Sequence, residues 1–202
     1  RQKIGLVFQF PEYQLFEDTV LKDISFGPKN FGKTKEEALS LARVAARDAG
    51  VEESLLEKSP FNLSGGQMRR VAIAGILASN PDVLILDEPT VGLDPVGKEN
   101  LMMLLTDIRE KTNKTIIMIT HDMNNVARFA TRVIVLSHGD IVFDGTPKAL
   151  FNDFSILEKY NLGLPVCAKY AHTLKEKGLI SYNEIPITKE ELLDIIKEAS
   201  HE

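Results

Sequence analysis

The sequence predicts an α/β fold with a mostly parallel sheet, followed by a helical extension. Short apolar runs alternate with segments of helical periodicity up to about residue 146. Strands that alternate with helices are typical of a parallel sheet whose faces are covered by those helices. From about Thr146 onward the pattern is helical throughout, and this change marks the start of the extension.

Composition and charge restrict the classes of protein to which the chain could belong. The chain has 202 residues, of which 44% are hydrophobic, so one large domain or a domain with an appendage is expected. A net charge of −5 gives no electrostatic reason to expect a nucleic-acid partner. Cys167 is the one cysteine, which excludes an internal disulfide and favours a reducing compartment. Because no apolar run reaches roughly 18 residues, any membrane association is expected to go through a protein partner.

The individual elements follow from apolar spacing and from helix caps. We expect a strand over residues 4–8, a loop over 9–16 and a helix over 18–26. Thr34 and Glu37 have the spacing of a capping box, so a second helix is expected from Thr34 to about Ala49, with Gly50 ending it. The later elements are a helix ending near residue 78, a strand over 83–86, a helix over 95–111, a strand over 115–120, a helix over 122–130, and hairpin strands over 132–136 and 141–143.

The most informative segment is Leu63 to Gln67, which has the sequence LSGGQ. Ser64 and Gln67 have the spacing of a capping box, which would explain a helix start and nothing more. A cap does not explain Gly65 and Gly66, since each glycine in a helix costs roughly 1 kcal/mol relative to alanine. Bare backbone at a helix N-terminus allows an anion to approach closely. The segment therefore predicts a helix start that contacts a phosphate.

Polar residues at the ends of the expected strands are candidates for phosphoryl-transfer chemistry. Asp87 and Glu88 follow an apolar strand, where an aspartate can hold Mg²⁺ and a neighbouring carboxylate can deprotonate the attacking water. Gln9 follows the first strand and could reach the metal or the water. His121 follows another strand, at the edge that faces the ligand crevice of an open α/β sheet. The alternatives are solvated acids, a polar loop residue and a structural histidine.

Taken in order, these elements resemble the ATP-binding cassette (ABC) family of P-loop NTPases. The matching motifs are the Q-loop glutamine Gln9, the signature Leu63 to Gln67, Walker B at Val83 to Glu88, the D-loop at Gly92 to Asp94, and the switch histidine His121. The resemblance covers about residues 1–147 and implies two cassettes packed head to tail, with the signature of one closing over the ATP of the other. Asp94 followed by Pro95 also has a simpler interpretation, as a helix N-cap.

The resemblance implies a role for each matching residue. The catalytic residues would be Glu88, His121 and Gln9, and the Mg²⁺ ligands would be Asp87 and Gln9. The residues that contact nucleotide across the cassette interface would be Ser64, Gly65, Gly66, Gln67 and Asp94.

A match to the Walker A pattern of this family, Gly27 to Thr34, is rejected as a phosphate-binding loop. Such a loop should follow a buried strand, whereas residues 18–26 have helical spacing. Pro28 lacks one of the N–H donors that a phosphate cradle needs, and Thr34 already caps a helix. The match also lies after the Q-loop, although the family places Walker A before it. The chain is therefore expected to lack the true Walker A lysine and the N-terminal strand beneath it. It resembles either a fragment of a cassette or a degenerate one, and its intact motifs favour a fragment that is inactive alone.

Other segments resemble the ATP-binding subunits of energy-coupling factor transporters, also called cobalt-type import ATPases. These segments are residues 8–16, 23–32 (DISFGPKNFG), 164–165 and 186–192. The resemblance implies ATP-driven uptake of a vitamin or a transition-metal ion. It implies like or unlike pairs of ATPases at the cytoplasmic face of the cell membrane, held peripherally by a transmembrane coupling subunit and working with a substrate-binding membrane subunit. Phe10, Tyr13, Leu15 and Phe16 would form a docking surface, or would pack inward.

The expected organisation is an ABC ATPase domain over residues 1–147, with a helical subdomain over about 17–80, and an extension over 148–202. Val166, Tyr170 and Leu174 of the extension would cover its own sheet or meet a second copy. Two other functions are considered. One is a non-hydrolysing ABC-like binding module, and the other is an ABC ATPase of the DNA-repair type. ABC ATPases of the DNA-repair type insert long coiled coils or other large modules between the Q-loop and the signature, whereas the stretch from Gln9 to Leu63 in this chain is short. The transported solute and the identity of the paired cassette stay open.

Overall fold

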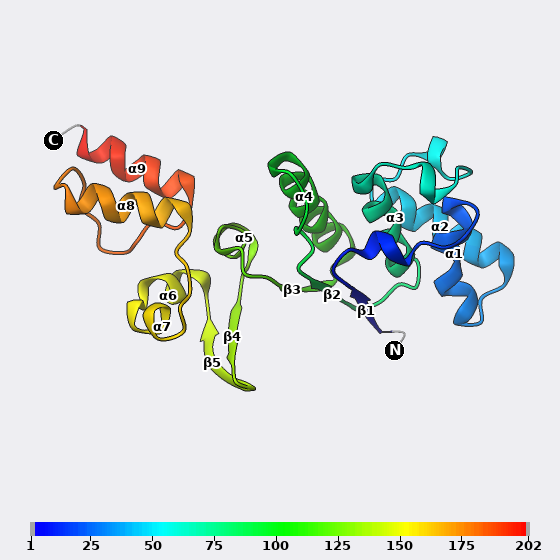
Figure 1. Ribbon diagram of the computed structural model, residues 1–202, viewed down its shortest axis with the longest axis horizontal. Coiled ribbons are helices and arrows are strands. Elements are labelled where there is room, and N and C mark those ends of the chain that lie inside the picture. Colours follow the sequence, from blue (N-terminus) through cyan, green and yellow to red (C-terminus); the bar gives the residue numbers. More distant parts are fainter. Residues whose placement is uncertain (1–2, 201–202) are drawn as a thin grey trace. The chain divides into compact units, whose positions relative to one another are not determined.

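The computed structural model describes residues 3–200, which form two compact units (Figure 1). Unit 1 runs up to Thr120 and unit 2 begins at His121. No helix in the described part of the chain is long and apolar enough to cross a bilayer.

Unit 1 is built on a three-stranded parallel sheet. Strands β1 (Ile4–Val7), β2 (Val83–Asp87) and β3 (Thr115–Ile119) lie in the order β1-β2-β3, so β2 is the central strand. Leu6 pairs with Ile85, which pairs with Ile117 in turn. The parallel sheet expected from the alternating pattern is therefore confirmed.

The two faces of this sheet differ in their exposure. On one face Val7, Leu84 and Leu86 are fully buried. Helix α3 (Gly65–Leu77) packs against β1, and α4 (Pro95–Thr112) packs against β3 (Figure 1). The opposite face carries large apolar side chains that are 38–54% exposed, namely Ile4, Leu6, Ile117 and Ile119. Parallel sheets are normally covered on both faces, so these side chains form a hydrophobic strip suited to packing against further structure.

The helical part of unit 1 consists of α1 (Val20–Asn30), α2 (Lys35–Asp48) and α3, which pack on one another. The short 3₁₀ turn η1 (Pro11–Gln14) precedes α1, and η2 (Glu53–Leu55) and η3 (Pro60–Asn62) lie between α2 and α3. The capping box of Thr34 and Glu37 is present, and Gly50 ends the second helix with a positive φ of 65°, as expected. The buried side chains of this part include Val20, Ile24, Ala38, Ala42, Val71 and Ile73.

The Walker A match does not form a phosphate-binding loop. Helix α1 does not end near residue 26 as expected, but continues through Gly27 and Pro28 to Asn30. A Cβ atom added to Gly27 would lie 2.6 Å from the Ser79 hydroxyl and 3.3 Å from the Gly75 carbonyl oxygen. The glycine is therefore explained by the close approach of α1 to the segment around α3. The helical structure on which the rejection of this match rests is confirmed.

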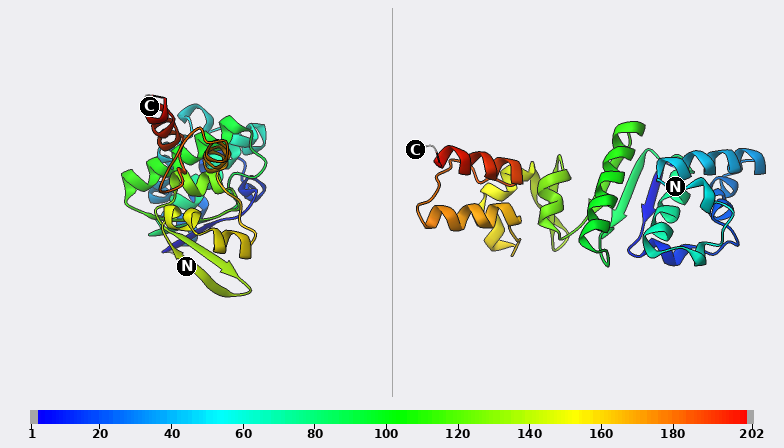
Figure 2. Two further views of the ribbon diagram at one scale, coloured as in Figure 1. Left: turned by 90° about the vertical axis from the view of Figure 1, so that its left-hand side faces the viewer. Right: turned by 90° about the horizontal axis from the view of Figure 1, so that it is seen from above.

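Unit 2 begins with α5 (Met123–Phe129) and a β-hairpin. Strands β4 (Val133–Ser137) and β5 (Asp140–Gly145) pair antiparallel, and the turn residues His138 and Gly139 both have positive φ, as tight hairpins require. Helices α6 (Pro147–Asn152), α7 (Phe154–Lys159), α8 (Val166–Glu176) and α9 (Lys189–Ala199) follow. Helices α8 and α9 lie side by side (Figure 1 and Figure 2). Between residues 146 and 200 the structure contains no further strand, as expected.

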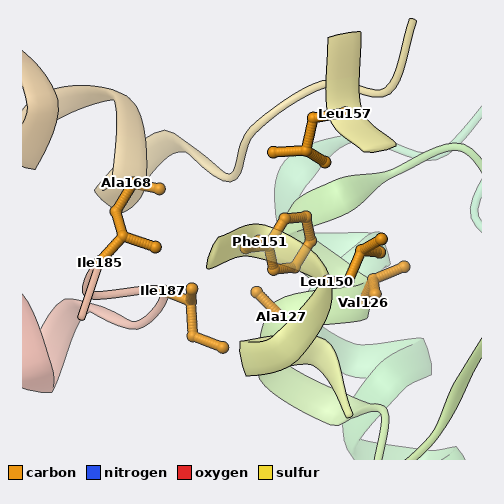
Figure 3. Close-up of a cluster of buried hydrophobic side chains, with 8 residues drawn as sticks. All are labelled: Val126, Ala127, Leu150, Phe151, Leu157, Ala168, Ile185 and Ile187. Atoms are coloured by element: carbon orange, nitrogen blue, oxygen red, sulfur yellow. The ribbon is translucent and has the colours of Figure 1, made fainter. Parts of the chain in front are cut away.

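One hydrophobic core joins the hairpin region to the helical extension. It is centred on Phe151, and Figure 3 shows its members: Val126, Ala127, Leu150, Phe151, Leu157, Ala168, Ile185 and Ile187. The buried face of α8 consists of the small side chains of Ala168 and Ala171, whereas Val166 and Tyr170 are 48% and 63% exposed. The compact units thus divide at residue 120, while the family-domain boundary at residue 147 stays a prediction.

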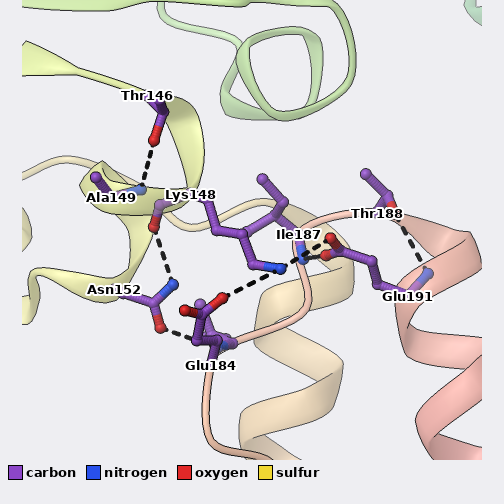
Figure 4. Close-up of polar contacts among 9 residues, drawn as sticks. Thr146, Lys148, Ala149, Asn152, Glu184, Ile187, Thr188 and Glu191 are labelled. Carbon is purple, nitrogen blue, oxygen red and sulfur yellow. Dashed lines mark hydrogen bonds and ion pairs between the residues drawn. The ribbon is translucent and has the colours of Figure 1, made fainter.

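Polar contacts hold α9 to α6 (Figure 4). The Lys148 ammonium lies 3.2 Å from Glu191 and 3.3 Å from Glu184, and these hydrogen bonds raise the pKa of Lys148. The Ile187 N–H donates to Glu191 at 2.8 Å. Burial alone would raise the pKa of Glu191, but the bonds from Ile187 and Lys148 outweigh it and lower that pKa below its ordinary value of 4.5.

We expect Glu191→Gln to reduce the free energy of unfolding by about 1 kcal/mol at pH 7, a modest value because both partners are over a third exposed to screening solvent. Because the folded pKa of Glu191 is lowered, its contribution is complete above pH 4.5 and is lost as pH falls through the folded pKa. Urea titrations at several pH values should therefore show the deficit at pH 7 and its disappearance in acid. Glu190→Gln, at an exposed position in the same helical turn, is the control. A deficit independent of pH would contradict this assignment.

Lys33→Ala in the complete protein should leave the affinity for ATP nearly unchanged, because Lys33 follows the end of α1 and does not belong to a phosphate cradle. Equilibrium binding of ATP measures this. A loss of more than tenfold, which is about 1.4 kcal/mol, would show that the segment binds phosphate after all.

Candidate functional site

The signature segment forms an exposed, capped helix start. The Ser64 hydroxyl accepts the Gln67 N–H at 3.4 Å, and the Gln67 side chain accepts the Ser64 N–H at 3.0 Å, which confirms the capping box. A Cβ atom added to Gly65 or to Gly66 would meet nothing within 4 Å among the described residues. Packing within the chain therefore gives no reason for either glycine. What remains is a helix N-terminus whose bare backbone faces outward, where an anion could approach.

The end of β2 carries a strained glutamate. Asp87 is the last residue of β2, and Glu88 follows with a φ of 46°, in the left-handed region. That conformation costs roughly 1–2 kcal/mol for a residue with a Cβ atom. Neighbouring backbone bonds hold it: the Glu88 N–H donates to the Ile119 carbonyl at 2.9 Å, and the Val91 N–H donates to the Glu88 carbonyl at 3.2 Å. Backbone strain of this kind concentrates at functional sites.

The loop after Gln9 lies against the D-loop. Gln9 is exposed, two residues beyond the end of β1. The next residue, Phe10, has a φ of 57°. A Cβ atom added to Gly92, which itself has a φ of 77°, would lie 3.5 Å from the Phe10 ring. The structure thus brings the loop of Gln9 next to the loop that follows Glu88.

The apolar residues of the loop after Gln9 were expected either to form a docking surface or to pack inward, and the structure shows some of each. Leu15 is buried and packs inward, whereas Tyr13 is 84% exposed. Phe16 is 56% exposed and packs edge to face on Phe26 with ring centroids 4.7 Å apart. Phe10 is half-buried, and its ring centroid lies 5.9 Å from that of Tyr13. The loop is therefore anchored by one apolar side chain and presents others on the surface of unit 1.

Arg69 connects three of these segments, and the sequence analysis missed it. Its side chain, 5% exposed, donates from Nε and Nη2 to the two carboxylate oxygens of Glu12 at 3.2 and 3.0 Å. Its Nη1 donates to the carbonyl oxygens of Pro89 at 2.9 Å and Val91 at 3.2 Å. We call these four residues the Arg69 clamp. Arg69 lies four residues before Ile73 on the buried face of α3, and an arginine at an apolar helical position is the signal that could have found it.

The clamp places a charge pair in the interior. Fork-to-fork pairing of an arginine with a carboxylate is the strongest and most directional of the ion pairs. Removing one partner of a buried pair typically costs about 3–5 kcal/mol, because the other charge stays buried without compensation.

The remaining predicted residues are placed as follows. Asp94 is exposed and its carboxylate accepts the Gly97 N–H at 2.7 Å at the start of α4, so the N-cap interpretation is confirmed. His121 is exposed and is the first residue of unit 2, whereas the other predicted site residues belong to unit 1. Residues 3–200 contain no group of three or more acidic, histidine or cysteine side chains arranged to hold a metal ion.

The parallel sheet and the capped, glycine-rich helix start are those expected of an ATP-binding cassette. Residues 1–91 match the family described as ABC transporter. The chain is similar in structure to cbiO1 from Clostridium perfringens, described as part of the ABC transporter complex cbiONQ. The TM-score is 0.71 at 40% identity, with coverage of 87% of this chain and 68% of that one. It is also similar to a dimeric ATP-binding cassette, MJ0796, in a post-hydrolysis state bound to ADP and Pi. There the TM-score is 0.58 at 37% identity, with coverage of 72% and 63%.

The chain belongs to the ATP-binding proteins of energy-coupling factor transporters, a branch of the ABC family. It is 53% identical over 196 residues to energy-coupling factor transporter ATP-binding protein EcfA2 of Ligilactobacillus salivarius, covering 97% of this chain and 68% of that protein. It is 52% identical over 196 residues to EcfA2 of Streptococcus sanguinis, covering 97% and 70%. The chain therefore spans about two thirds of the length of these relatives. The fold class predicted from the sequence is confirmed.

Gly66→Ala should stabilise the chain by about 0.5 kcal/mol, since alanine favours the helix and the site has open space. The same change should lower ATP turnover in the complete protein, because a methyl group would occupy the approach of the phosphate. Thermal unfolding and steady-state hydrolysis measure the two effects. Gly27→Ala is the matched control: it has no room beside Ser79 and should destabilise. Unchanged turnover in Gly66→Ala would separate the glycine from the nucleotide.

Proposed function

We propose that the complete protein binds ATP and hydrolyses it as a cassette dimer, and that closure and opening of this dimer drive the uptake of a vitamin or a transition-metal ion. The observation that carries the proposal is the edge of the unit 1 sheet. There the loop after Gln9 lies next to the loop that follows the strained residue Glu88, and the open signature helix starts in the same unit. Family membership supports nucleotide binding.

Within this proposal, Glu88 is the general base that takes a proton from the attacking water. The left-handed backbone at Glu88 turns the chain immediately after Asp87, which ends the strand. Gln9 would contact the metal or the water from the neighbouring loop, and His121 would have the role of the family's switch histidine, that of contacting the transferred phosphate. A carboxylate and a positioned amide suit this chemistry, in which catalysis is mostly positioning and electrostatic stabilisation.

The residues also fit a Mg²⁺ ion. Mg²⁺ prefers oxygen ligands and is usually held by one or two protein groups together with substrate phosphates and water. Asp87, at the end of β2, and Gln9, two residues beyond the end of the adjacent strand β1, would supply two such oxygens. When bound, the ion would neutralise charge on the phosphates.

The second half of the nucleotide site serves the partner cassette. Ser64, Gly65, Gly66 and Gln67 would contact the ATP held by the other subunit through the exposed helix start. Asp94 would lie at the same interface, next to its N-cap bond. The dimer of the similar MJ0796 cassette supports pairing of this kind.

The proposed partners are a second ABC ATPase subunit, like or unlike, a transmembrane coupling subunit and a substrate-binding membrane subunit. We place the protein peripherally at the cytoplasmic face of the cell membrane. The exposed side chains of Tyr13 and Phe16 support a docking surface near the Q-loop. The short helical stretch from Gln9 to Leu63 and the net charge of −5 disfavour an ABC ATPase of the DNA-repair type.

Glu88→Gln in the complete protein should retain ATP binding, abolish turnover and trap a nucleotide-bound dimer, because the amide cannot accept the proton of the water. Steady-state hydrolysis and size-exclusion chromatography with ATP measure these effects. Glu110→Gln, at an exposed position of α4, is the control. Near-normal hydrolysis would remove Glu88 as the general base, and a wild-type protein without turnover would favour a non-hydrolysing binding module.

A further inference from the structure

We propose that Arg69 is a positioning residue that fixes the catalytic loop after β2 relative to the Q-loop and the signature helix, so that the two half-sites of one cassette move together. The inference rests on the proposed function. In this proposal the Arg69 side chain contacts neither the nucleotide nor the attacking water. It acts through its bonds to Glu12 of the Q-loop and to the backbone carbonyls that follow Glu88.

The first argument is the position of the clamp partners along the chain. Glu12 lies three residues after Gln9, and Pro89 immediately follows Glu88. Arg69 itself lies on the helix that begins with the signature, two residues after Gln67. One guanidinium therefore bonds to segments that carry both the own-nucleotide residues and the partner-nucleotide residues.

The second argument is the rigidity of the clamp. The side chains of Arg69 and Glu12 are 5% and 13% exposed, so solvent screens their pairing little. Four hydrogen bonds to a planar group leave it little freedom to rotate. The Phe10 ring against Gly92 adds an apolar contact between the same two loops. We therefore expect a displacement of the Q-loop to displace the D-loop with it.

The third argument is the strain at Glu88. Its N–H is held by the Ile119 carbonyl, and the next carbonyl, that of Pro89, is held by Arg69. These bonds hold the backbone on both sides of a residue whose φ of 46° is unfavourable. Without the bond from Arg69 the peptide after Pro89 could rotate, and the backbone that holds Glu88 in its unfavourable conformation would be constrained by fewer bonds. The expected consequence is slower chemistry with unimpaired ATP binding.

Arg69→Lys tests the inference in the complete, assembled protein. Lysine keeps the charge but cannot bond to Glu12 and the two carbonyls in one fixed geometry. We expect kcat to fall at least tenfold while KM for ATP stays within twofold. Arg43→Lys, which alters an exposed ion pair of α2 in the same unit, should retain wild-type kcat. Bound ATP per chain, measured at saturation, counts the folded and competent fraction.

A second variant separates positioning from simple stability. Glu12→Gln keeps the shape of the side chain and leaves the bonds from Arg69 to the carbonyls available. It should also lower kcat, and the double variant should be no slower than Arg69→Lys alone, because both changes break the same clamp. Wild-type kcat per competent chain in Arg69→Lys, or in Glu12→Gln if the former does not fold, would overturn the inference. Multiplied effects in the double variant would do the same, whereas absence of turnover in the wild type would overturn the proposed function itself.

Discussion

The structure of unit 1 depends on the parallel pairing of β2 with strands on both of its sides. Leu86 pairs with Val7 on one side and with Met118 on the other. Parallel strands bring their carboxyl ends to the same edge of a sheet, so residues far apart in the chain meet there without long loops. The buried residues Leu84 and Leu86 hold β2 under the helices, and the candidate site residues Gln9 and Glu88 lie in the short segments that follow the strands.

Helix α3 combines two functions that would conflict on a shorter helix. Its body is buried through Val71, Ile73 and Leu77, which fixes its direction. Its first turn has glycines with open space around them and is capped by Ser64. The packing of the body compensates for the weak helix propensity of the start, since most helical stability in proteins comes from tertiary contacts. An exposed helix start can therefore remain well defined.

Local patterns could be predicted from the sequence, and features that depend on distant residues could not. The capping boxes at Thr34 and Ser64 need only residues three positions apart, and both were found. The continuation of α1 through Gly27 depends on the approach of Ser79, which spacing along the chain does not reveal. The positive φ of Glu88 and the division of the chain at residue 120 likewise arise from tertiary packing. Family motifs identified the candidate site, but not the arginine that connects its loops.

The span of the Arg69 clamp has a consequence for how this protein acquires its native state. Arg69 lies 57 residues from Glu12 and 20 from Pro89, with two helices formed in between. Contacts of such sequence separation form only after the intervening chain has been ordered, because loop closure has an entropic cost. The helices can therefore form before the loop that follows Glu88 is fixed, and the Arg69 clamp would be completed in a late step of folding.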